Sequence, residues 1–466
     1  MYRGVFVFIF EPSYMTHKYS IFGKSFLRRG FTFLLLFFTI VSSIAQTTVD
    51  AMMKEGNGLL GQKKYQEALL VFDKVLKSFP KNADAYYSRG VTYYNLAKPI
   101  DAVSDYTRAL FYNPQKVEAL INRGSTFSEM QKFDDALNDF NKAIEMFPLR
   151  ADVYNNRGYL YSIQKKYDLA ITDFDKAISL NKKYNMAYIN KAYAWSALGS
   201  DSLAIDVLTK LVAIAPDFSS AYFNRAVIYR RLGKNNQSLS DYNKGLSFES
   251  NDVRALLMRA EIKDELSDER GAIEDCSKVI QLEKQNAVAY YTRALAEYDL
   301  KQYDKIIVDC SEAIKYKENY FEAFTLRGNA YDFLGKYKEA LVDYSIAIEK
   351  NSNSTDAYNQ RAIAETQKGN ITGAISDFSR ALKIDPENLD LLNKRGRLWL
   401  AIKSYENALL DFNKILEINT DDIKGLVTRG DIFILLNKTE YACADYKRAE
   451  SLGDGGAMSK RIFNCK

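Results

Sequence analysis

Apolar and small residues recur along the chain in blocks of 34 residues. From Val49, twelve blocks follow one another without insertion or deletion, starting at residues 49, 83, 117, 151, 185, 219, 253, 287, 321, 355, 389 and 423. Within a block, apolar or small residues at positions 4, 8 and 11, and again at positions 20, 24 and 27, follow the spacing of one helix face. Each block is therefore predicted to form two amphipathic helices.

Two breaks in this pattern predict the turns between the helices. Position 15 is glycine in four repeats, and position 32 is proline in five. Both residue types are typical of helix ends and turns. The chain is thus expected to read helix, turn, helix, turn over residues 49–456. The residues concerned are Gly199, Gly233, Gly335, Gly369, Pro80, Pro114, Pro148, Pro216 and Pro386.

Position 8 is small in every repeat, and Gly158 in "NRGYLYSIQKK" is an example. A glycine inside a helix costs roughly 0.5–1 kcal/mol relative to alanine, and close helix packing can offset that cost. We expect Gly158 to face Ala170 at position 20. A phosphate-binding loop is the alternative, but no strand pattern precedes the glycine.

These repeats resemble the tetratricopeptide repeat family, in the form with "RG" in the first helix and "D-[FY]-x-[KR]-A" in the second. The resemblance extends from Val49 to about Leu452. It implies an all-α fold, an α-solenoid wound as a right-handed superhelix, whose first helices line a concave groove for a protein or peptide partner. The chain departs from the family pattern at Lys263, Glu297 and Glu365, at the usually aromatic position 11, and at Ile306, at the usually small position 20.

Position 7 is arginine and position 23 is aspartate in the same ten repeats. The two exceptions coincide, because repeat 1 has Glu55 with Val71 and repeat 5 has Lys191 with Val207. Positions that change together are usually in contact. We therefore expect an Arg–Asp pair in each repeat, with the arginine of the following repeat as the alternative partner. Ten copies favour a structural pair over a catalytic one.

Residues 1–45 resemble a secretory signal peptide, followed by a short lead-in at 46–48. Basic residues precede an apolar run from Gly30 to Val41, and Ser43-Ile44-Ala45 fits a cleavage site. An uncleaved membrane anchor is the alternative, although the run is shorter than the roughly 20 residues of a spanning helix. Met15 is a possible start. The expected location is periplasmic, envelope-associated or secreted, without membrane insertion after cleavage.

Cleavage would change the charge of the chain and its available chemistry. Removing five Lys/Arg and one Glu from a net charge of +5 leaves +1, which does not support nucleic-acid binding. The only histidine, His17, is removed as well, which excludes histidine triads and histidine metal sites. No catalytic, cofactor-binding or metal-binding residue is predicted. The expected function is a non-enzymatic interaction scaffold, with a structural subunit of an envelope or secretion/assembly complex as the alternative.

The four cysteines fall into two groups. Cys276 and Cys310 stand at position 24 and are interpreted as buried core thiols. Cys443 and Cys465 are a possible disulfide between the last long helix and a capping helix at 457–466.

Positions 5, 9 and 12 face the concave side in the resembling family and are not needed for packing between helices. In this chain many of them are apolar or aromatic, a composition suited to an extended peptide or an amphipathic helix. Arg230 and Arg231, beside Asp264 and Glu265, are expected to orient that partner. Some members of the family bind a carboxylate with Lys and Asn at fixed first-helix positions of neighbouring repeats. Asn57 and Asn329 match the asparagine, but the following repeats carry Asp84 and Asp356, so this clamp is not assembled. The predicted groove residues are Tyr87, Val91, Tyr94, Tyr159, Ile189, Tyr193, Phe223, Val227, Tyr291, Leu295 and Tyr298.

Overall fold

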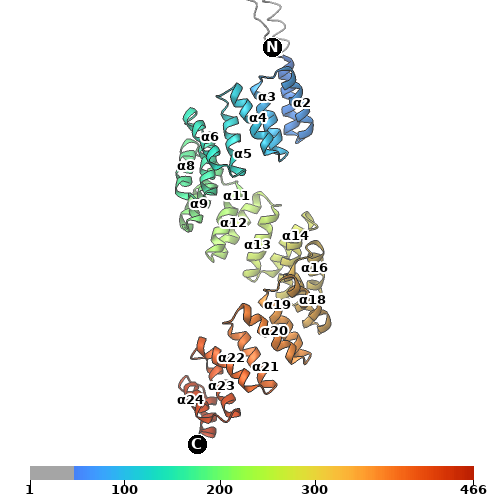
Figure 1. Cartoon of the computed structure of the whole chain (residues 1–466), viewed down its shortest axis with the longest axis vertical. Helices are drawn as coiled ribbons and strands as arrows, with labels where there is room; N and C mark the ends of the chain where they lie inside the picture. The colour runs from blue at the N-terminus through green and yellow to red at the C-terminus, as the bar shows by residue number, and fades with distance from the viewer. Residues whose placement is uncertain (1–46, 466) are drawn as a thin grey trace, which may run out of the picture. The chain divides into compact units, whose positions relative to one another are not determined.

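The structure is a computed structural model that describes residues 47–465. Within this range all regular secondary structure is helical, and the helices follow one another in chain order along a stack of repeats (Figure 1). The expectation of an all-α solenoid of helix–turn–helix units is confirmed. The predicted signal peptide and His17 lie outside the described residues.

The first helix of each repeat occupies positions 1–13. In repeat 1 the helix covers 47–61 and so takes in part of the expected lead-in. The others are α3 (Ala83–Asn95), α5 (Val117–Glu129), α7 (Ala151–Ile163), α9 (Asn185–Ala197), α11 (Ser219–Arg231), α13 (Val253–Glu265), α15 (Ala287–Asp299), α17 (Phe321–Phe333), α19 (Thr355–Gln367), α21 (Leu389–Ala401) and α23 (Ile423–Leu435).

The second helix begins at position 17 after a short turn. The second helices are α2 (Tyr65–Ser78), α4 (Pro99–Tyr112), α6 (Phe133–Met146), α8 (Tyr167–Leu180), α10 (Asp201–Ile214), α12 (Asn235–Phe248), α14 (Glu269–Leu282), α16 (Tyr303–Tyr316), α18 (Tyr337–Lys350), α20 (Ile371–Ile384), α22 (Tyr405–Ile418) and α24 (Thr439–Ser451).

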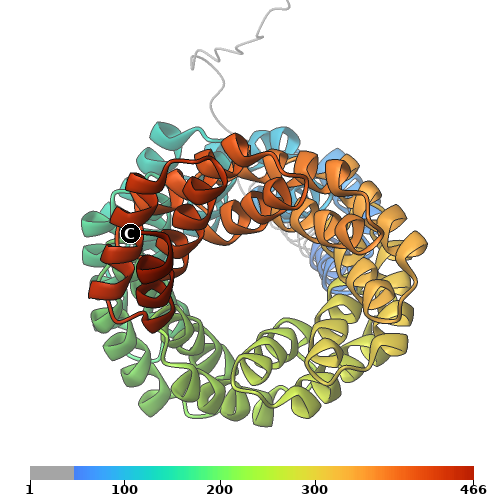
Figure 2. The same ribbon diagram turned by 90° about the horizontal axis from the view of Figure 1, so that it is seen from below.

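Helix packing divides the repeats into two compact bodies. The N-terminal body ends at Val207 and the C-terminal body begins at Leu208, inside α10. Within each body the helices form two layers (Figure 2). Successive first helices contact one another, as α3, α5, α7 and α9 do in the N-terminal body and α13, α15, α17 and α19 in the C-terminal body. The first helices therefore form the closely spaced, inner layer of each body.

Small residues at position 8 allow the two helices of a repeat to approach. A Cβ atom added to Gly158 would lie 2.7 Å from the Phe174 ring and 3.1 Å from the carbonyl oxygen of Ala170. The expected partner, Ala170, is thus only the second contact, and the aromatic ring at position 24 is the first. Gly158 therefore faces Ala170 as expected, and the ring at position 24 lies closer still.

The repeats without an aromatic residue at position 24 keep the core filled in another way. Cys276 and Cys310 are fully buried free thiols, as interpreted from the sequence. Burial raises the pKa of Cys276 to about 12, so this thiol is protonated and unreactive. Ile306 is also fully buried and packs in one cluster with Cys310 and Ala294, so a larger residue at position 20 accompanies a smaller one at position 24.

All ten expected Arg–Asp pairs form within their own repeat. In each, the arginine donates from Nε and Nη2 to both carboxylate oxygens at 2.5–3.0 Å. The side chain of Asp173 is only 6% exposed and that of Arg157 20%. The hydrogen bond to Asp173 is the main cause that raises the pKa of Arg157. The alternative partner in the following repeat is not used.

The same arginines also reach back to the preceding repeat. Nη1 donates to a small polar side chain at position 25 of that repeat over 2.6–3.1 Å. In repeat 5, Lys191 lacks an aspartate in its own repeat but keeps this second contact, with Asp175 at 2.6 Å. The acceptors are Asp73, Thr107, Asn141, Asp175, Thr209, Asn243, Ser277, Ser311, Ser345, Ser379 and Asn413.

A short helix, α25 (Gly455–Asn464), covers the end of the last repeat. It begins two residues before the expected Ala457, because Asp454 accepts a hydrogen bond from the backbone of Ala457 as the N-cap. Ala457 is buried with Leu426 of α23. Cys443 of α24 and Cys465 form a disulfide with a Cα–Cα distance of 5.8 Å.

Candidate protein-binding face

The eleven predicted groove residues all lie on first helices, and none of them is buried. Four are exposed, namely Tyr94, Tyr159, Tyr193 and Val227, and the other seven are half-buried. Six belong to the N-terminal body and five, from Phe223 to Tyr298, to the C-terminal body. The structure gathers seven of them around three hollows.

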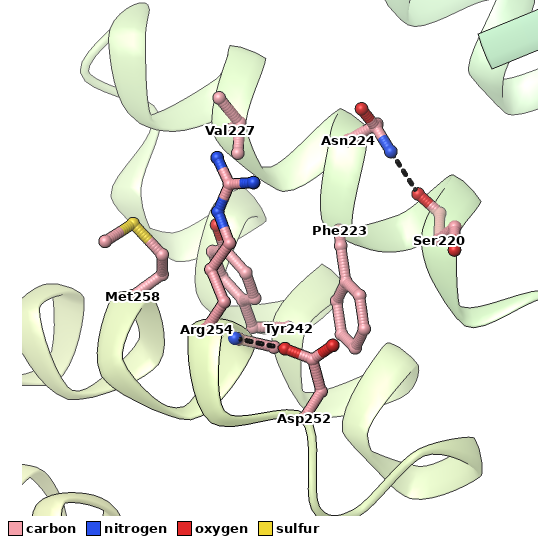
Figure 3. A pocket seen from close by; sticks show the side chains of 9 residues that line it. Ser220, Phe223, Asn224, Val227, Tyr242, Asp252, Arg254 and Met258 are labelled. Atoms are coloured by element: carbon pink, nitrogen blue, oxygen red, sulfur yellow. Dashed lines mark hydrogen bonds between the residues drawn. The ribbon is translucent and has the colours of Figure 1, made fainter. Parts of the chain in front are cut away.

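The hollow between α11 and α13 contains Phe223 and Val227 (Figure 3). Its volume is about 190 Å³. Phe223 lies on one side and Met258 on the other, with the Arg254 side chain between them in this view. Asp252 also lines the hollow, but its carboxylate accepts from the backbone of Ala255 at 2.6 Å and so caps α13.

A glycine that sequence reasoning missed holds Phe223 in place. A Cβ atom at Gly245 of α12 would lie 2.3 Å from the Phe223 ring, so only glycine leaves room for it. The ring also stacks on Tyr242, with 5.9 Å between centroids. Gly245 stands at position 27, where other repeats often carry alanine, and this departure was the available signal.

The second hollow, of about 320 Å³, lies between α15, α17 and the start of α19. Tyr291, Leu295 and Tyr298 line it, together with two carboxylates, Glu322 and Asp356. Burial raises the pKa of Tyr291 to about 12. This combination of aromatic rings and acids suits a cationic side chain rather than a carboxylate.

The third hollow belongs to the N-terminal body and lies between α3 and α5. Val91 and Tyr94 line it with Asn122, and its volume is about 280 Å³. The Tyr94 hydroxyl donates to Glu129, and this hydrogen bond is the first cause that raises its pKa to about 12. Tyr94 therefore presents its ring to the hollow while its hydroxyl is already engaged.

The expectation that these positions take no part in helix packing is wrong for several of them. Tyr87 lies 6.1 Å from the Tyr106 ring and accepts from Asn122 at 3.1 Å. Tyr291 lies 4.9 Å from the Tyr320 ring. Such side chains contact neighbouring helices and also face the inner layer, because the first helices lie close together there.

Arg230, one of the two arginines expected to orient a partner, is engaged in ion pairs within the protein. Arg230 donates to Glu261 and to Glu265 at 2.6 Å each, so repeats 6 and 7 are tied together by this side chain. Its charge is therefore largely neutralised within the inner layer, and the expectation that it orients a partner is not supported.

Two carboxylates stand at position 12, namely Asp264, which was expected beside the arginines of repeat 6, and Asp332, which sequence reasoning missed. Oδ1 of Asp264 and Oδ1 of Asp332 are buried without a hydrogen-bond partner among the described residues. Burial, and then Asp299, Glu269 and Glu265, raise the pKa of Asp264 to about 6; burial also raises the pKa of Asp332. Both stand at the repeat position that Tyr298 occupies in repeat 8.

Between residues 47 and 465, no cluster of three or more His, Cys, Asp or Glu side chains could hold a metal ion. No helix in the same range is long and apolar enough to cross a membrane.

Several solved structures resemble this chain. A tetratricopeptide repeat protein from Parabacteroides merdae is 22% identical and matches 53% of this chain and 98% of its own, with a TM-score of 0.43. Cut9–Hcn1, an APC/C hetero-tetramer, is 14% identical over 90% of this chain and 96% of its own, with a TM-score of 0.41. Yeast Tom70 is 17% identical over 89% of this chain and 99% of its own, with a TM-score of 0.40. No curated protein matches the sequence significantly.

Sequence models of the family described as "Tetratricopeptide repeat" match six segments that together cover more than half of the chain. The segments are 151–184 for one model, 53–99, 325–388 and 361–423 for a second, and 117–148 and 219–252 for a third. They fall in both bodies and agree with the helix–turn–helix units described above. The chain belongs to the tetratricopeptide repeat family.

Proposed function

We propose that this protein is a non-enzymatic scaffold that holds an apolar or aromatic segment of a partner protein against its first helices. One observation carries the proposal: three hollows lie among the first helices, and each is lined by residues of positions 5, 9 or 12. Shallow apolar hollows with a few polar groups are typical of sites that take the side chains of a bound peptide.

The charges suggest which partner residues go where in the C-terminal body. Arg254 beside Phe223 and Met258 favours an apolar residue next to an acid. Glu322 and Asp356 beside Tyr291 and Tyr298 favour a basic side chain two repeats further on.

We further propose that the protein acts after export across a membrane. The N-terminal sequence pattern and the Cys443–Cys465 disulfide support this, because disulfides persist in oxidising compartments.

The test compares a triple variant with a double control variant. Each is used to capture partners from the native cell envelope. Tyr291→Ala with Leu295→Ala and Tyr298→Ala removes the second hollow. Val342→Ala with Leu410→Ala, on second helices and 58% and 67% exposed, is the matched control.

We expect the hollow variant to lose the proteins that wild type captures, with helical content unchanged by circular dichroism, and the control to retain them. Unchanged capture by the folded hollow variant would place the site elsewhere. Native gels of the captured material then separate a transient scaffold from a permanent structural subunit, which would migrate as a stoichiometric complex.

A further inference from the structure

In three of the ten repeats with an Arg–Asp pair, the arginine lies between two aromatic rings of its own first helix. The rings stand at positions 4 and 11, one turn before and one turn after the arginine. In three repeats the guanidinium carbon is 5.6–5.9 Å from both ring centroids. These are Arg89 with Tyr86 and Tyr93, Arg157 with Tyr154 and Tyr161, and Arg225 with Tyr222 and Tyr229.

Repeat 8 has only one of these two rings. Arg293 lies 5.7 Å from the ring of Tyr290 at position 4, but position 11 is Glu297. Glu297 is only 4% exposed, and its Oε2 has no hydrogen-bond partner within residues 47–465. A buried carboxylate oxygen without a donor is costly, so the local structure is incomplete as it stands.

The two other departures at position 11 are internally satisfied. Lys263 forms an ion pair with Asp275 at 3.0 Å. Glu365 accepts from Nδ2 of Asn370 at 2.8 Å. Position 11 therefore carries an unpaired group in repeat 8 but not in repeats 7 and 10.

A hollow lies where the second ring is missing. It has a volume of about 500 Å³, and Ile273 of α14, Arg293 and Glu297 of α15, and Lys305 and Val308 of α16 line it. Val308 is 61% exposed, so the hollow is open to solvent. The hollow shares no residue with the predicted groove and is a separate place on the molecule.

We propose that this hollow binds an aromatic ring that carries an O–H or N–H donor, supplied by a tyrosine or tryptophan side chain of a partner protein. Repeats 2, 4 and 6 provide the template, since in each of them a ring at position 11 lies against the arginine. The ring would lie against the Arg293 guanidinium, Ile273 and Val308, which line the hollow.

The donor is what distinguishes tyrosine or tryptophan from phenylalanine at this site. Its hydrogen would be donated to Oε2 of Glu297, which has no other hydrogen-bond partner among the described residues. A phenylalanine ring would fill the same space but leave Oε2 unpaired, as it is in the unbound structure. We therefore expect a ring without a donor to bind about tenfold more weakly.

The experiment uses p-cresol and toluene as probes, with the full chain carrying labelled Ile and Val methyl groups. We expect p-cresol to shift the Ile273 and Val308 methyl signals saturably, and toluene to do so about tenfold more weakly. Glu297→Tyr supplies the missing ring from within and should abolish the shifts. Glu365→Tyr makes the same change at position 11 of repeat 10, where the glutamate already has a hydrogen-bond partner. In this variant p-cresol should shift the Ile273 and Val308 methyl signals as in wild type.

Three outcomes would overturn the proposal. They are the absence of a saturable shift in wild type, equal binding of the two probes, and unchanged p-cresol binding in Glu297→Tyr. Glu297→Leu guards against a folding defect in the tyrosine variant, because it removes the acceptor without adding a ring. This variant should bind p-cresol no better than toluene.

Discussion

At the scale of single residues, the arginine at position 7 connects three helices. Arg157 donates to Asp173 in the second helix of its own repeat and to Asn141 in the second helix of the repeat before. One planar side chain with several fixed donors can satisfy both directions at once. Lys191 makes only the backward contact, because its single ammonium group has no aspartate in its own repeat.

Removing the aspartate alone should harm the protein more than removing both partners. Asp173→Leu leaves Arg157 half-buried without its carboxylate, which costs about 3–5 kcal/mol when the partner stays buried. Arg157→Met with Asp173→Leu leaves no uncompensated charge, so its loss should be clearly smaller. Thermal melts of wild type and both variants test this. Losses that are equal, or that add up, would contradict the idea of a mutually dependent pair.

Glu297 should make the stability of the protein depend on pH. Burial, and then Asp309, raise its pKa from 4.5 to about 7, against the opposing effects of Arg293 and Lys305. A folded-state pKa above the unfolded one means that the folded state binds more protons, so stability falls as the pH rises from about 4.5 to about 7. The loss should be on the order of 2 kcal/mol relative to Glu297→Gln.

Chemical denaturation of wild type and Glu297→Gln at pH 5 and pH 8 checks this dependence. Glu365→Gln, at the same position of repeat 10, controls for the loss of a carboxylate as such. A constant difference between wild type and Glu297→Gln across this range would mean that Glu297 ionises as it does in the unfolded chain.

At the scale of elements, every turn between the two helices of a repeat uses one residue with positive φ. It stands at position 15 in all twelve repeats, although only four of them have glycine there. The other eight repeats place an ordinary residue in this conformation, as Ala97 does at φ 55°. Left-handed backbone costs a residue with a Cβ atom roughly 1–2 kcal/mol, and neighbouring helix packing must hold it there.

Exchanging residues at these turns should therefore change stability in opposite directions. Ala97→Gly should gain about 0.5–1 kcal/mol, because the strain disappears. Gly335→Ala should lose a similar amount, since φ is 72° and no atom lies near enough to its Cβ position to compensate. Urea denaturation of both variants measures the effects. A loss of stability in Ala97→Gly would show that flexibility of the unfolded chain outweighs the relief of strain.

At the scale of the whole molecule, repeats touch mainly their neighbours, so the last repeat depends on its cap. Stability in such proteins is roughly a sum of repeat and interface terms, and unfolding begins where a neighbour is missing. In the last repeat, α25 buries Ala457, pairs Arg461 with Glu450 at 2.6 Å, and is joined to α24 by the disulfide.

Opening the disulfide should loosen the C-terminal end first. A bond that closes a loop of 22 residues stabilises by about 3 kcal/mol in the chain-entropy account. Hydrogen exchange should therefore speed up in residues 423–465 after reduction, while residues 83–180 keep their protection.

Cys443→Ser with Cys465→Ser should match reduced wild type, because Cys276 and Cys310 are buried free thiols in either case. Unchanged protection of residues 423–465 after reduction would show that packing of α25 alone holds the cap.

Much of the architecture was readable from the sequence because the repeats serve as an internal alignment. The 34-residue register, the helix pairs and the all-α solenoid follow from periodic burial, which depends only on local spacing. The Arg–Asp pairs were readable because their exceptions coincide in repeats 1 and 5. The backward contact of the arginines left a signal too: position 25 is Asp, Asn, Ser or Thr in eleven repeats, and Lys447 stands in the twelfth, which no repeat follows.

The details of the candidate sites were decided only by the tertiary structure. Lys263, Glu297 and Glu365 look alike as departures from an aromatic position, yet only Glu297 is buried with an unpaired oxygen. Among the stripe of positions 5, 9 and 12, Tyr193 is 62% exposed whereas Tyr291 packs on Tyr320. The physical reason is the same in both cases. The space and the hydrogen-bond partners around a side chain come from neighbouring helices, and the periodic pattern of one repeat does not specify them.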